Sequence, residues 1–210
     1  MSRRQLLGHF AGAVVAAPAF SQDPRNRLEP TPQEIVGPFY PIAKPVDHDA
    51  DLTRIVGRRE RAAGQVIEVS GRVMDLAGRP VPDAELEIWQ ANAAGRYAHP
   101  SDDNPAPLDP NFQGYARVTT DTAGEYRIVT IKPGAYPGGR RGMRTPHIHF
   151  DLSGRVDRLV AQMYFPGEPL NATDALLSTN IRPAMVLATD IGPAASGIPR
   201  YRWDMIVRRG

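Results

Sequence analysis

Apolar and polar side chains alternate along much of this chain, and this alternation constrains its fold more than any other feature of the sequence. It begins at Val66 and is clearest over residues 67–73 and 84–88, where every second residue is apolar or glycine. Side chains of a β-strand point to opposite faces in turn, so a period of two predicts strands that bury one face. Further strands are predicted at residues 115–120, 126–131, 147–153, 159–164 and 201–207.

Turn residues separate these segments, because the chain contains 21 prolines and 19 glycines among its 210 residues. Frequent turns between short strands predict an all-β fold, an antiparallel β-sandwich of about seven or eight strands. Residues 100–114 and 132–145 are long for connections in such a domain, so we expect them to build a functional site. A short helix is predicted only at residues 172–177, with Asn171 as its cap.

The N-terminal third divides into two segments before the predicted sandwich, which covers residues 66–210. Residues 1–21 resemble a twin-arginine export signal, with Arg3 and Arg4 followed by an apolar run too short to span a bilayer. This signal predicts an exported, periplasmic protein, and the alternative is a frayed apolar terminus. Residues 22–65 are rich in proline and charge without periodicity, which predicts an extended arm.

Composition excludes several classes of site. The chain has no cysteine, so disulfides, thiolate zinc sites and iron–sulfur clusters are excluded, and any metal must be held by oxygen and imidazole donors. The formal net charge is +2, and without Arg3 and Arg4 the basic and acidic residues are equal in number. Charges of both signs are interspersed, so we expect no nucleic-acid partner.

Two histidines on the predicted strand 147–153 carry the strongest chemical signal. His147 and His149 should project from one face, while Ile148 and Phe150 project from the other and pack into the core. Two imidazoles side by side can bind a metal, but they can also be hydrogen-bonded parts of the structure. The histidines alone leave both interpretations open.

Tyrosines after two other predicted strands could complete a metal site. Tyr97 follows residues 94–96 and Tyr136 follows residues 133–135, and both could reach the face of the histidines. Phenolate is a hard anionic donor that favours ferric iron, whereas a lone tyrosine is more often a half-buried ring with a bonded hydroxyl. Spacing alone does not select these two from the seven tyrosines of the chain.

Four segments in a fixed order carry a resemblance to a known family. They are EIWQANAAGRY at residues 87–97, LDPNFQG at 108–114, IKPGAYP at 131–137 and RTPHIHF at 144–150. These segments resemble those of the intradiol ring-cleavage dioxygenases, and within that family most nearly the iron-binding subunits of the protocatechuate-cleaving branch. The resemblance covers about residues 70–169, with a weaker match at residues 37–41.

The resemblance implies a non-haem Fe(III) enzyme that cleaves a catechol with dioxygen to a muconate-type diacid. It implies four iron ligands, which are Tyr97, Tyr136, His147 and His149. Tyr136 would also act as a catalytic base, and Arg144 would stabilise negative charge on the bound ring. Four further residues would contact the substrate: Gln162, Trp89, Pro38 and Tyr40.

One departure from the family bears on the substrate. Residues 138–142 form a shorter loop than its counterpart, and Gly138 stands where the family member has a tryptophan. The pocket wall therefore differs, and the substrate could be protocatechuate-like or another substituted catechol. Members of the family assemble, so a homo-oligomer is possible.

A non-catalytic alternative remains at this stage. Residues 71–84 look like a hairpin that occurs in transthyretin-like β-sandwich binding modules. That interpretation gives no reason for the histidine pair, for the two tyrosine loops or for Arg144.

Overall fold

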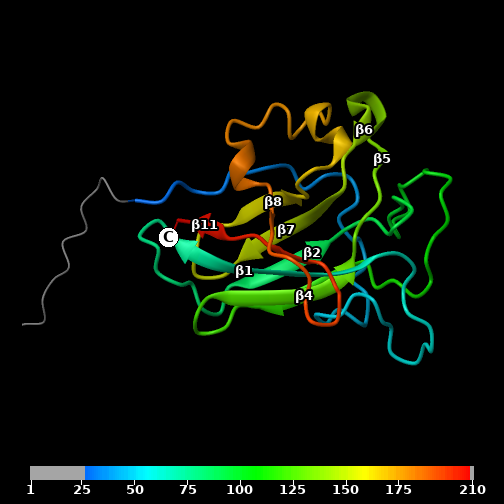
Figure 1. Cartoon of the computed structure of the whole chain (residues 1–210), viewed down its shortest axis with the longest axis horizontal. Helices are drawn as coiled ribbons and strands as arrows, with labels where there is room; N and C mark the ends of the chain where they lie inside the picture. Colours follow the sequence, from blue (N-terminus) through cyan, green and yellow to red (C-terminus); the bar gives the residue numbers. More distant parts are fainter. Residues whose placement is uncertain (1–26, 209–210) are drawn as a thin grey trace, which may run out of the picture.

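The computed structural model describes residues 27–208, which form two packed layers of β-sheet (Figure 1). The predicted export signal lies outside the described residues. Within residues 27–208 no helix has the length and apolarity needed to cross a membrane. The fold is all-β, as predicted, with 11 strands in place of the seven or eight expected.

The first sheet is built around its longest strand, β1 (Val66–Asp75), which alternates half-exposed and buried residues along its whole length. Strand β4 (Glu125–Ile131) pairs with it in the antiparallel sense. Strands β10 (Arg200–Arg202) and β11 (Met205–Val207) both pair with it in parallel, and β9 (Thr189–Asp190) continues the sheet beyond β10. The all-β sandwich is as predicted, and the parallel pairing of these two short strands with β1 is an additional feature.

The second sheet carries the strands on which the site is built. Its order is β3 (Tyr115–Thr119), β2 (Glu85–Trp89), β7 (His147–Ser153) and β8 (Leu159–Tyr164), all antiparallel. A short hairpin of β5 (Tyr136–Pro137) and β6 (Met143–Arg144) stands above it, with the 3₁₀ turn η2 (Gly139–Arg141) between the two. Figure 1 shows this hairpin beside the end of β7 and β8.

The hydrophobic core lies between the two sheets. Leu86, Ile88, Phe150 and Leu152 of the second sheet meet Val69 and other apolar residues of β1. Burying these side chains removes apolar area from water, which supplies most of the stability of such a sandwich. The alternation along the strands then turns the histidines of β7 to the opposite, outer face.

Residues 71–84 combine a short hairpin with a change of sheet. The amide of Val81 donates to the carbonyl of Val73 and Met74 pairs with Pro80 in an antiparallel bridge, but β1 and β2 belong to different sheets. The predicted strand 201–207 is divided, because Trp203 turns its indole inward to donate to the carbonyl of Met185 and Asp204 accepts from the amide of Arg72. As a result, two short strands, β10 and β11, pair with β1 in place of one longer strand.

The helix predicted at residues 172–177 is also wrong. The segment contains the 3₁₀ helix η3 (Pro169–Ala172) followed by turns, and a second short 3₁₀ helix, η4, spans Pro183–Met185. Asn171 does not cap a helix, since its amide donates to the carbonyl of Phe165 and its oxygen accepts from Thr145. Side-chain bonds to distant segments outweigh the local helical preference.

Residues 27–65 contain no regular helix or strand and contact both layers, since the amide of Leu52 donates to the carbonyl of Val129 on β4 while residues around Glu34 lie against β8. The backbone amide of Glu34 donates to the carbonyl of Val160 on β8. The side-chain amide of Gln162, also on β8, donates to the carbonyl of Ile35. Figure 1 shows the first part of this arm in blue, running along the side of the molecule that holds β8, and the rest of it in cyan. The arm covers the outer face of β8 and the core covers its inner face, so every residue of β8 is buried.

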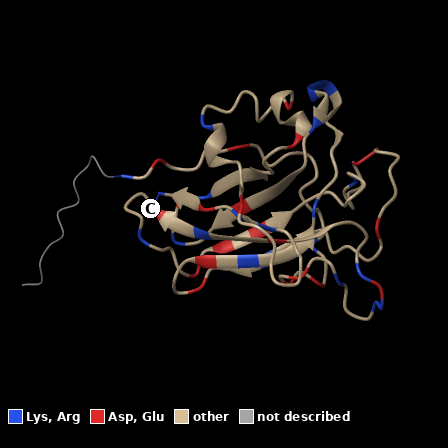
Figure 2. Cartoon of the chain, viewed as in Figure 1, with Lys and Arg blue, Asp and Glu red and all other residues tan. Residues whose placement is uncertain are grey.

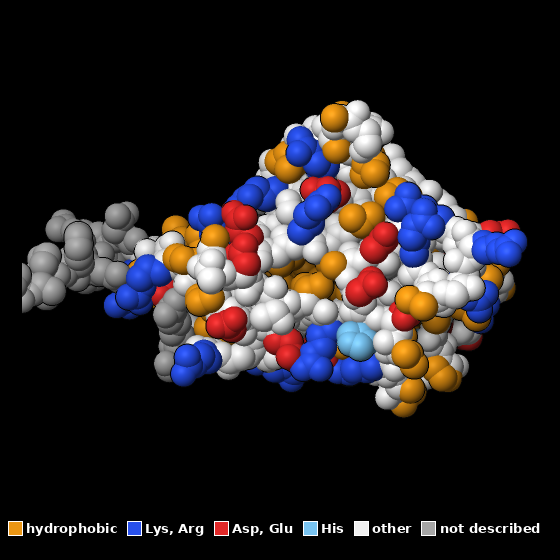
Figure 3. Space-filling view, turned by 90° about the horizontal axis from the view of Figure 1, so that it is seen from below, with side chains coloured by type: hydrophobic (Ala, Val, Ile, Leu, Met, Phe, Trp, Pro, Cys, Tyr) orange, Lys and Arg blue, Asp and Glu red, His pale blue; other side chains and the backbone are white. Residues whose placement is uncertain are grey.

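Charged side chains are distributed over both layers (Figure 2). On the face seen in Figure 3, acidic and basic side chains alternate with hydrophobic ones and form no stripe of one sign. Cross-strand pairs contribute to this pattern, since Arg127 of β4 pairs with Glu68 of β1 and Arg72 pairs with Glu125. The absence of a nucleic-acid partner stays a prediction.

We expect Gly71→Ala to destabilise the fold strongly. A Cβ atom on Gly71 would stand 1.8 Å from the carbonyl oxygen of Trp203, so the strands must separate locally. Overpacking of this kind should lower the free energy of unfolding by roughly 3 kcal/mol, measured by urea denaturation. Ser70→Ala, at the half-exposed neighbouring position, is the control. A Gly71→Ala protein as stable as this control would contradict the packing described.

Candidate metal centre

Strand β7 places two imidazoles side by side on the outer face of the second sheet. The ring centres of His147 and His149 are 4.9 Å apart, and both side chains are almost fully buried. Their β8 partners across the ladder are Tyr164 and Gln162, respectively. The predicted orientation is confirmed, since Ile148 and the other inner-face residues of β7 pack in the core.

Two glycine-containing loops bring the tyrosines together. A Cβ on Gly95 would meet the carbonyl oxygen of Ala135 at 2.1 Å, and one on Gly134 would meet that of Ala93 at 2.5 Å. Only glycine allows two backbones to approach this closely, and Gly95 also has a positive φ of 78°. The loops that precede Tyr97 and Tyr136 therefore pack directly on each other.

All four predicted ligands meet at one place. The hydroxyl oxygen of Tyr136 lies 3.2 Å from Nε2 of His147. The rings of Tyr97 and Tyr136 are 5.3 Å apart, and those of Tyr97 and His149 are 6.2 Å apart. Donors from three separate segments of the sequence thus converge on one buried spot.

Both histidines are held in the neutral form that a metal requires. Burial and, to a smaller extent, the nearby charge of Arg144 lower the pKa of His147 to about 3, although the hydrogen bond to the carbonyl of Thr145 opposes them. Burial also lowers the pKa of His149 well below its usual range, with His147 and Arg144 adding to the effect. Nδ1 of His147 donates to the carbonyl of Thr145 at 2.6 Å, which directs the lone pair of Nε2 toward Tyr136.

The tyrosines, in contrast, do not ionise by themselves in this environment. Burial raises the pKa of Tyr97 well above its usual range, and the neighbouring Tyr136 raises it further. Burial also raises the pKa of Tyr136, although the charge of Arg144 opposes this. A bound cation would reverse the preference, because a metal ion stabilises the phenolate that coordinates it.

The donor atoms fit a metal ion that favours oxygen and imidazole. The hydroxyl of Tyr97 and Nδ1 of His149 are buried without a hydrogen-bond partner among the described residues, a costly state for polar atoms. Residues 27–208 contain no group of three or more His, Cys, Asp or Glu that could hold a metal. A metal at this place would therefore need the tyrosines, and phenolates with neutral imidazoles suit Fe(III).

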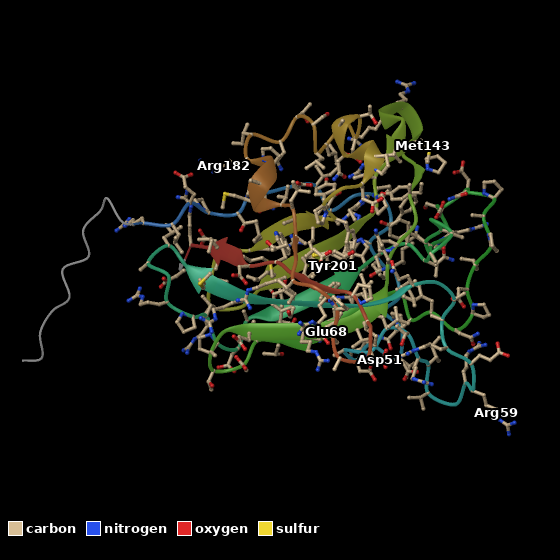
Figure 4. The ribbon with its side chains drawn as sticks, in the orientation of Figure 1. Asp51, Arg59, Glu68, Met143, Arg182 and Tyr201 are labelled. Carbon is tan, nitrogen blue, oxygen red and sulfur yellow. The ribbon has the colours of Figure 1, made fainter. Side chains whose placement is uncertain are left out.

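Arg144 lies beside the four donors and is held by several partners. Its side chain is 6% exposed, and its Nε donates to Asp174 at 2.8 Å. Its Nη2 donates to the amide oxygen of Gln162 at 2.6 Å and to the hydroxyl of Tyr164 at 3.2 Å. In Figure 4 the neighbouring Met143 marks the β5–β6 hairpin that carries this arginine. Arg144 is therefore part of a buried network and not of a surface salt bridge.

The residues predicted to contact the substrate occupy different environments. Gln162 is fully buried, and both ends of its amide are engaged, by Arg144 and by the carbonyl of Ile35. Trp89 stacks face to face on His149 with the ring centres 4.7 Å apart, so that it supports this imidazole from behind.

Tyr40 and Pro38 stand farther from the donors. The hydroxyl of Tyr40 donates to Glu87, and its ring packs edge-on against Trp89. Pro38 is exposed. Contact with a substrate stays a prediction for all four of these residues.

Phe39 and Tyr164 belong to the site but were not predicted. Phe39 of the arm stacks on Tyr97 with ring centres 4.7 Å apart and lies edge-on to Tyr136 at 6.0 Å. The arm has no periodicity that would have indicated this contact. Tyr164 could have been found, because it shares the parity of Gln162 along β8 and therefore its face.

Glu34 of the arm should make the stability of the metal-free protein depend on pH. The pKa of Glu34 is raised to about 7, mainly by burial and in small part by the charge of Asp174. Hydrogen bonds from Tyr164 and Asn180 and the charge of Arg144 act in the opposite direction. The folded state then resists ionisation of Glu34, so stability is lost as pH rises from about 4.5 to about 7.

Replacement by glutamine should remove this loss. We expect the melting temperature of wild type to fall relative to that of Glu34→Gln over this pH range, measured by thermal unfolding. Glu29→Gln is the control, since this arm carboxylate is mostly exposed and pairs with Arg182. Parallel curves for wild type and Glu34→Gln would contradict the assignment.

Comparison with known proteins agrees with this geometry. A family model described as "Dioxygenase" matches residues 35–209. The protocatechuate 3,4-dioxygenase beta chain of Burkholderia cepacia is 52% identical over 136 residues, which cover 63% of this chain and 57% of that one. The alpha chain from the same organism is 32% identical over 190 residues, covering 85% of this chain and 92% of that one.

A solved structure is similar over most of the fold. It is the dioxygenase domain of a dioxygenase carbohydrate-binding protein fusion from Streptomyces sp. SirexAA-E, with a TM-score of 0.65 and 28% identity. The match covers 87% of this chain and all of that domain. Among the curated relatives, this chain spans little more than half of the length of the beta chain and half of that of a catechol 1,2-dioxygenase from Acinetobacter baylyi.

Proposed function

Because this chain belongs to the intradiol ring-cleavage dioxygenase family, we propose that it uses non-haem Fe(III) and dioxygen to open the ring of a catechol. The observation that carries the proposal is the convergence of two neutral imidazoles and two phenols, with one hydroxyl and one imidazole nitrogen buried and unpartnered. Tyr97, Tyr136, His147 and His149 would hold the iron. When bound, Fe(III) supplies Lewis acidity that makes a chelated catechol reactive toward dioxygen.

The residues of the chain would divide the remaining tasks. Tyr136 is assigned the role of base, because its phenolate oxygen can take a proton from a catechol hydroxyl and the charge of Arg144 favours this anionic form. Arg144 is assigned the stabilisation of negative charge that develops on the ring. Phe39, Trp89 and the β8 side chains would exclude water from the reacting groups.

The substrate is proposed to be a catechol with a protocatechuate-like or other ring substituent, and the product a muconate-type diacid. The named relatives include chains of a protocatechuate 3,4-dioxygenase and a catechol 1,2-dioxygenase, which supports the substrate class without selecting a member. The short 3₁₀ turn η2 (Gly139–Arg141) lies in the loop where the sequence departs from the family. We therefore propose that this loop contributes to selectivity.

Two proposals concern the context of the enzyme. The twin-arginine-like residues at the N-terminus support export to the periplasm. The relatives named as alpha and beta chains support an oligomer, which we propose to be a homo-oligomer of this chain. A non-catalytic transthyretin-like module is not favoured, since it gives no reason for the convergence of the histidine pair and the two tyrosines.

The proposed function is tested by iron content, colour and oxygen uptake. Protein expressed with iron should retain about one iron per chain and be red-brown, because tyrosinate-to-Fe(III) charge transfer absorbs visible light. Oxygen uptake with a panel of substituted catechols should yield ring-opened diacids, identified by mass spectrometry. A colourless, iron-free protein that leaves every catechol intact would refute the proposal.

A further inference from the structure

Asp174 is a fully buried carboxylate that lies behind Arg144, in a segment expected to be helical. One of its oxygens accepts from Nε of Arg144 at 2.8 Å and from the amide of Thr145 at 2.9 Å. The other accepts from the amides of Leu176 and Leu177 at 3.0 Å each. Both oxygens are therefore saturated by protein donors, none of which belongs to the four proposed iron ligands.

The contacts of Arg144 with the described residues leave one of its three guanidinium nitrogens able to donate to a ligand. Nε is taken by Asp174, and Nη2 is taken by Gln162 and Tyr164. Nη1 has no hydrogen-bond partner among residues 27–208 and is the remaining donor of the guanidinium. Because the guanidinium is planar, fixing Nε and Nη2 also fixes the direction in which Nη1 donates.

We infer that Asp174 is a positioning residue, which orients Arg144 so that Nη1 is available to the reacting ring. The inference rests on the proposed function. It also gives Asp174 a second effect, since the same carboxylate anchors the turn at Leu176 and Leu177 and so joins this turn to the hairpin that carries Arg144. The orientation of the arginine and the position of the turn are thereby coupled.

Asp174→Asn tests the inference through turnover. The amide cannot accept from all four donors, so Arg144 loses its fixed orientation, and we expect kcat to fall by a factor on the order of ten. The KM and the iron content should stay close to those of wild type, because Asp174 touches neither the substrate nor the proposed iron ligands. Loss of iron in place of loss of kcat would overturn the inference.

A double-mutant cycle separates positioning from general damage. In an Arg144→Leu background the Asp174→Asn change should lower kcat by less than about twofold, since the group it orients is gone. A further loss on the order of ten in that background would overturn the inference. Asp75→Asn is the matched control, because Asp75 is also buried and binds Nε of Arg79 at 2.8 Å, but lies outside the site. It should lower stability and leave kcat unchanged.

A third test is made on the wild-type protein, so it does not depend on whether an Asp174 variant folds. In ¹H–¹⁵N spectra of the iron-free protein, the Nε–H signal of Arg144, assigned by its loss in Arg144→Leu, should exchange slowly with water. Arg59, at the exposed tip of a loop in Figure 4, is the reference for fast exchange. Equal exchange rates for the two would overturn the inference.

The two proposals can fail separately. A wild-type protein that cleaves no catechol overturns the proposed function and this inference together. An active wild type whose kcat is unaffected by Asp174→Asn overturns only the inference.

Discussion

The His149→Ala protein should be purified without its proposed iron. His149 supplies one of two neutral nitrogen donors, and its neighbours on the same face of the sheet cannot replace it. Trp89 has no lone pair to offer, and the amide of Gln162 is already bonded to Arg144. Iron affinity should fall by at least about a hundredfold, since that is the upper range for losing a group that only orients a ligand.

Metal analysis of protein purified without added chelator measures this result, and the visible absorption should disappear with the iron. His147→Ala should behave in the same way, because Nε2 of His147 lies against the hydroxyl of Tyr136. His48→Ala is the control, since His48 is an exposed residue of the arm. One iron per chain in either of the two strand variants, with the colour of wild type, would mean that the ligand set is wrong.

The strand that carries the histidines and its neighbour could be predicted with their observed bounds. Residues 147–153 and 159–164 agree with β7 and β8, because the first alternates, the second is mostly apolar, and turn residues follow both. The pairing of strands could not be predicted in the same way. The parallel partners of β1 lie more than 100 residues farther along the chain, and no local pattern indicates which strands become neighbours.

The residues of the candidate site also differ in whether the sequence could predict them. The four donors could be named because their segments match a family pattern, and the structure brings them together. Asp174 and Phe39 could not be named, since each acts through a contact with a distant segment and belongs to no periodic stretch. Sequence reasoning named the four donors together with Arg144, Trp89 and Gln162, but missed the supporting residues that lie in segments without a pattern.

Tyr136→Phe should separate iron binding from turnover. The variant keeps Tyr97 and both histidines, so we expect it to retain iron. It lacks the phenolate oxygen assigned to take the catechol proton, and loss of a general base lowers kcat by a factor on the order of a hundred or more. The hydroxyl that is removed contacts His147, and the charge of Arg144 favours its ionised form, so the variant loses a base that lies beside the metal donors.

Two variants control for the loss of a buried hydroxyl. Tyr126→Phe removes one that donates to the carbonyl of Trp203 on the other side of the core, and should lower stability while kcat stays unchanged. Tyr97→Phe removes the other proposed phenolate, and should weaken Fe(III) binding and shift the charge-transfer band, because Tyr97 is proposed to stay on the metal throughout. Stopped-flow mixing with a catechol, first without and then with oxygen, measures both the proton-coupled binding step and ring opening. If Tyr136→Phe turned over at the wild-type rate with its iron in place, Tyr136 could not be the base, even were it a ligand.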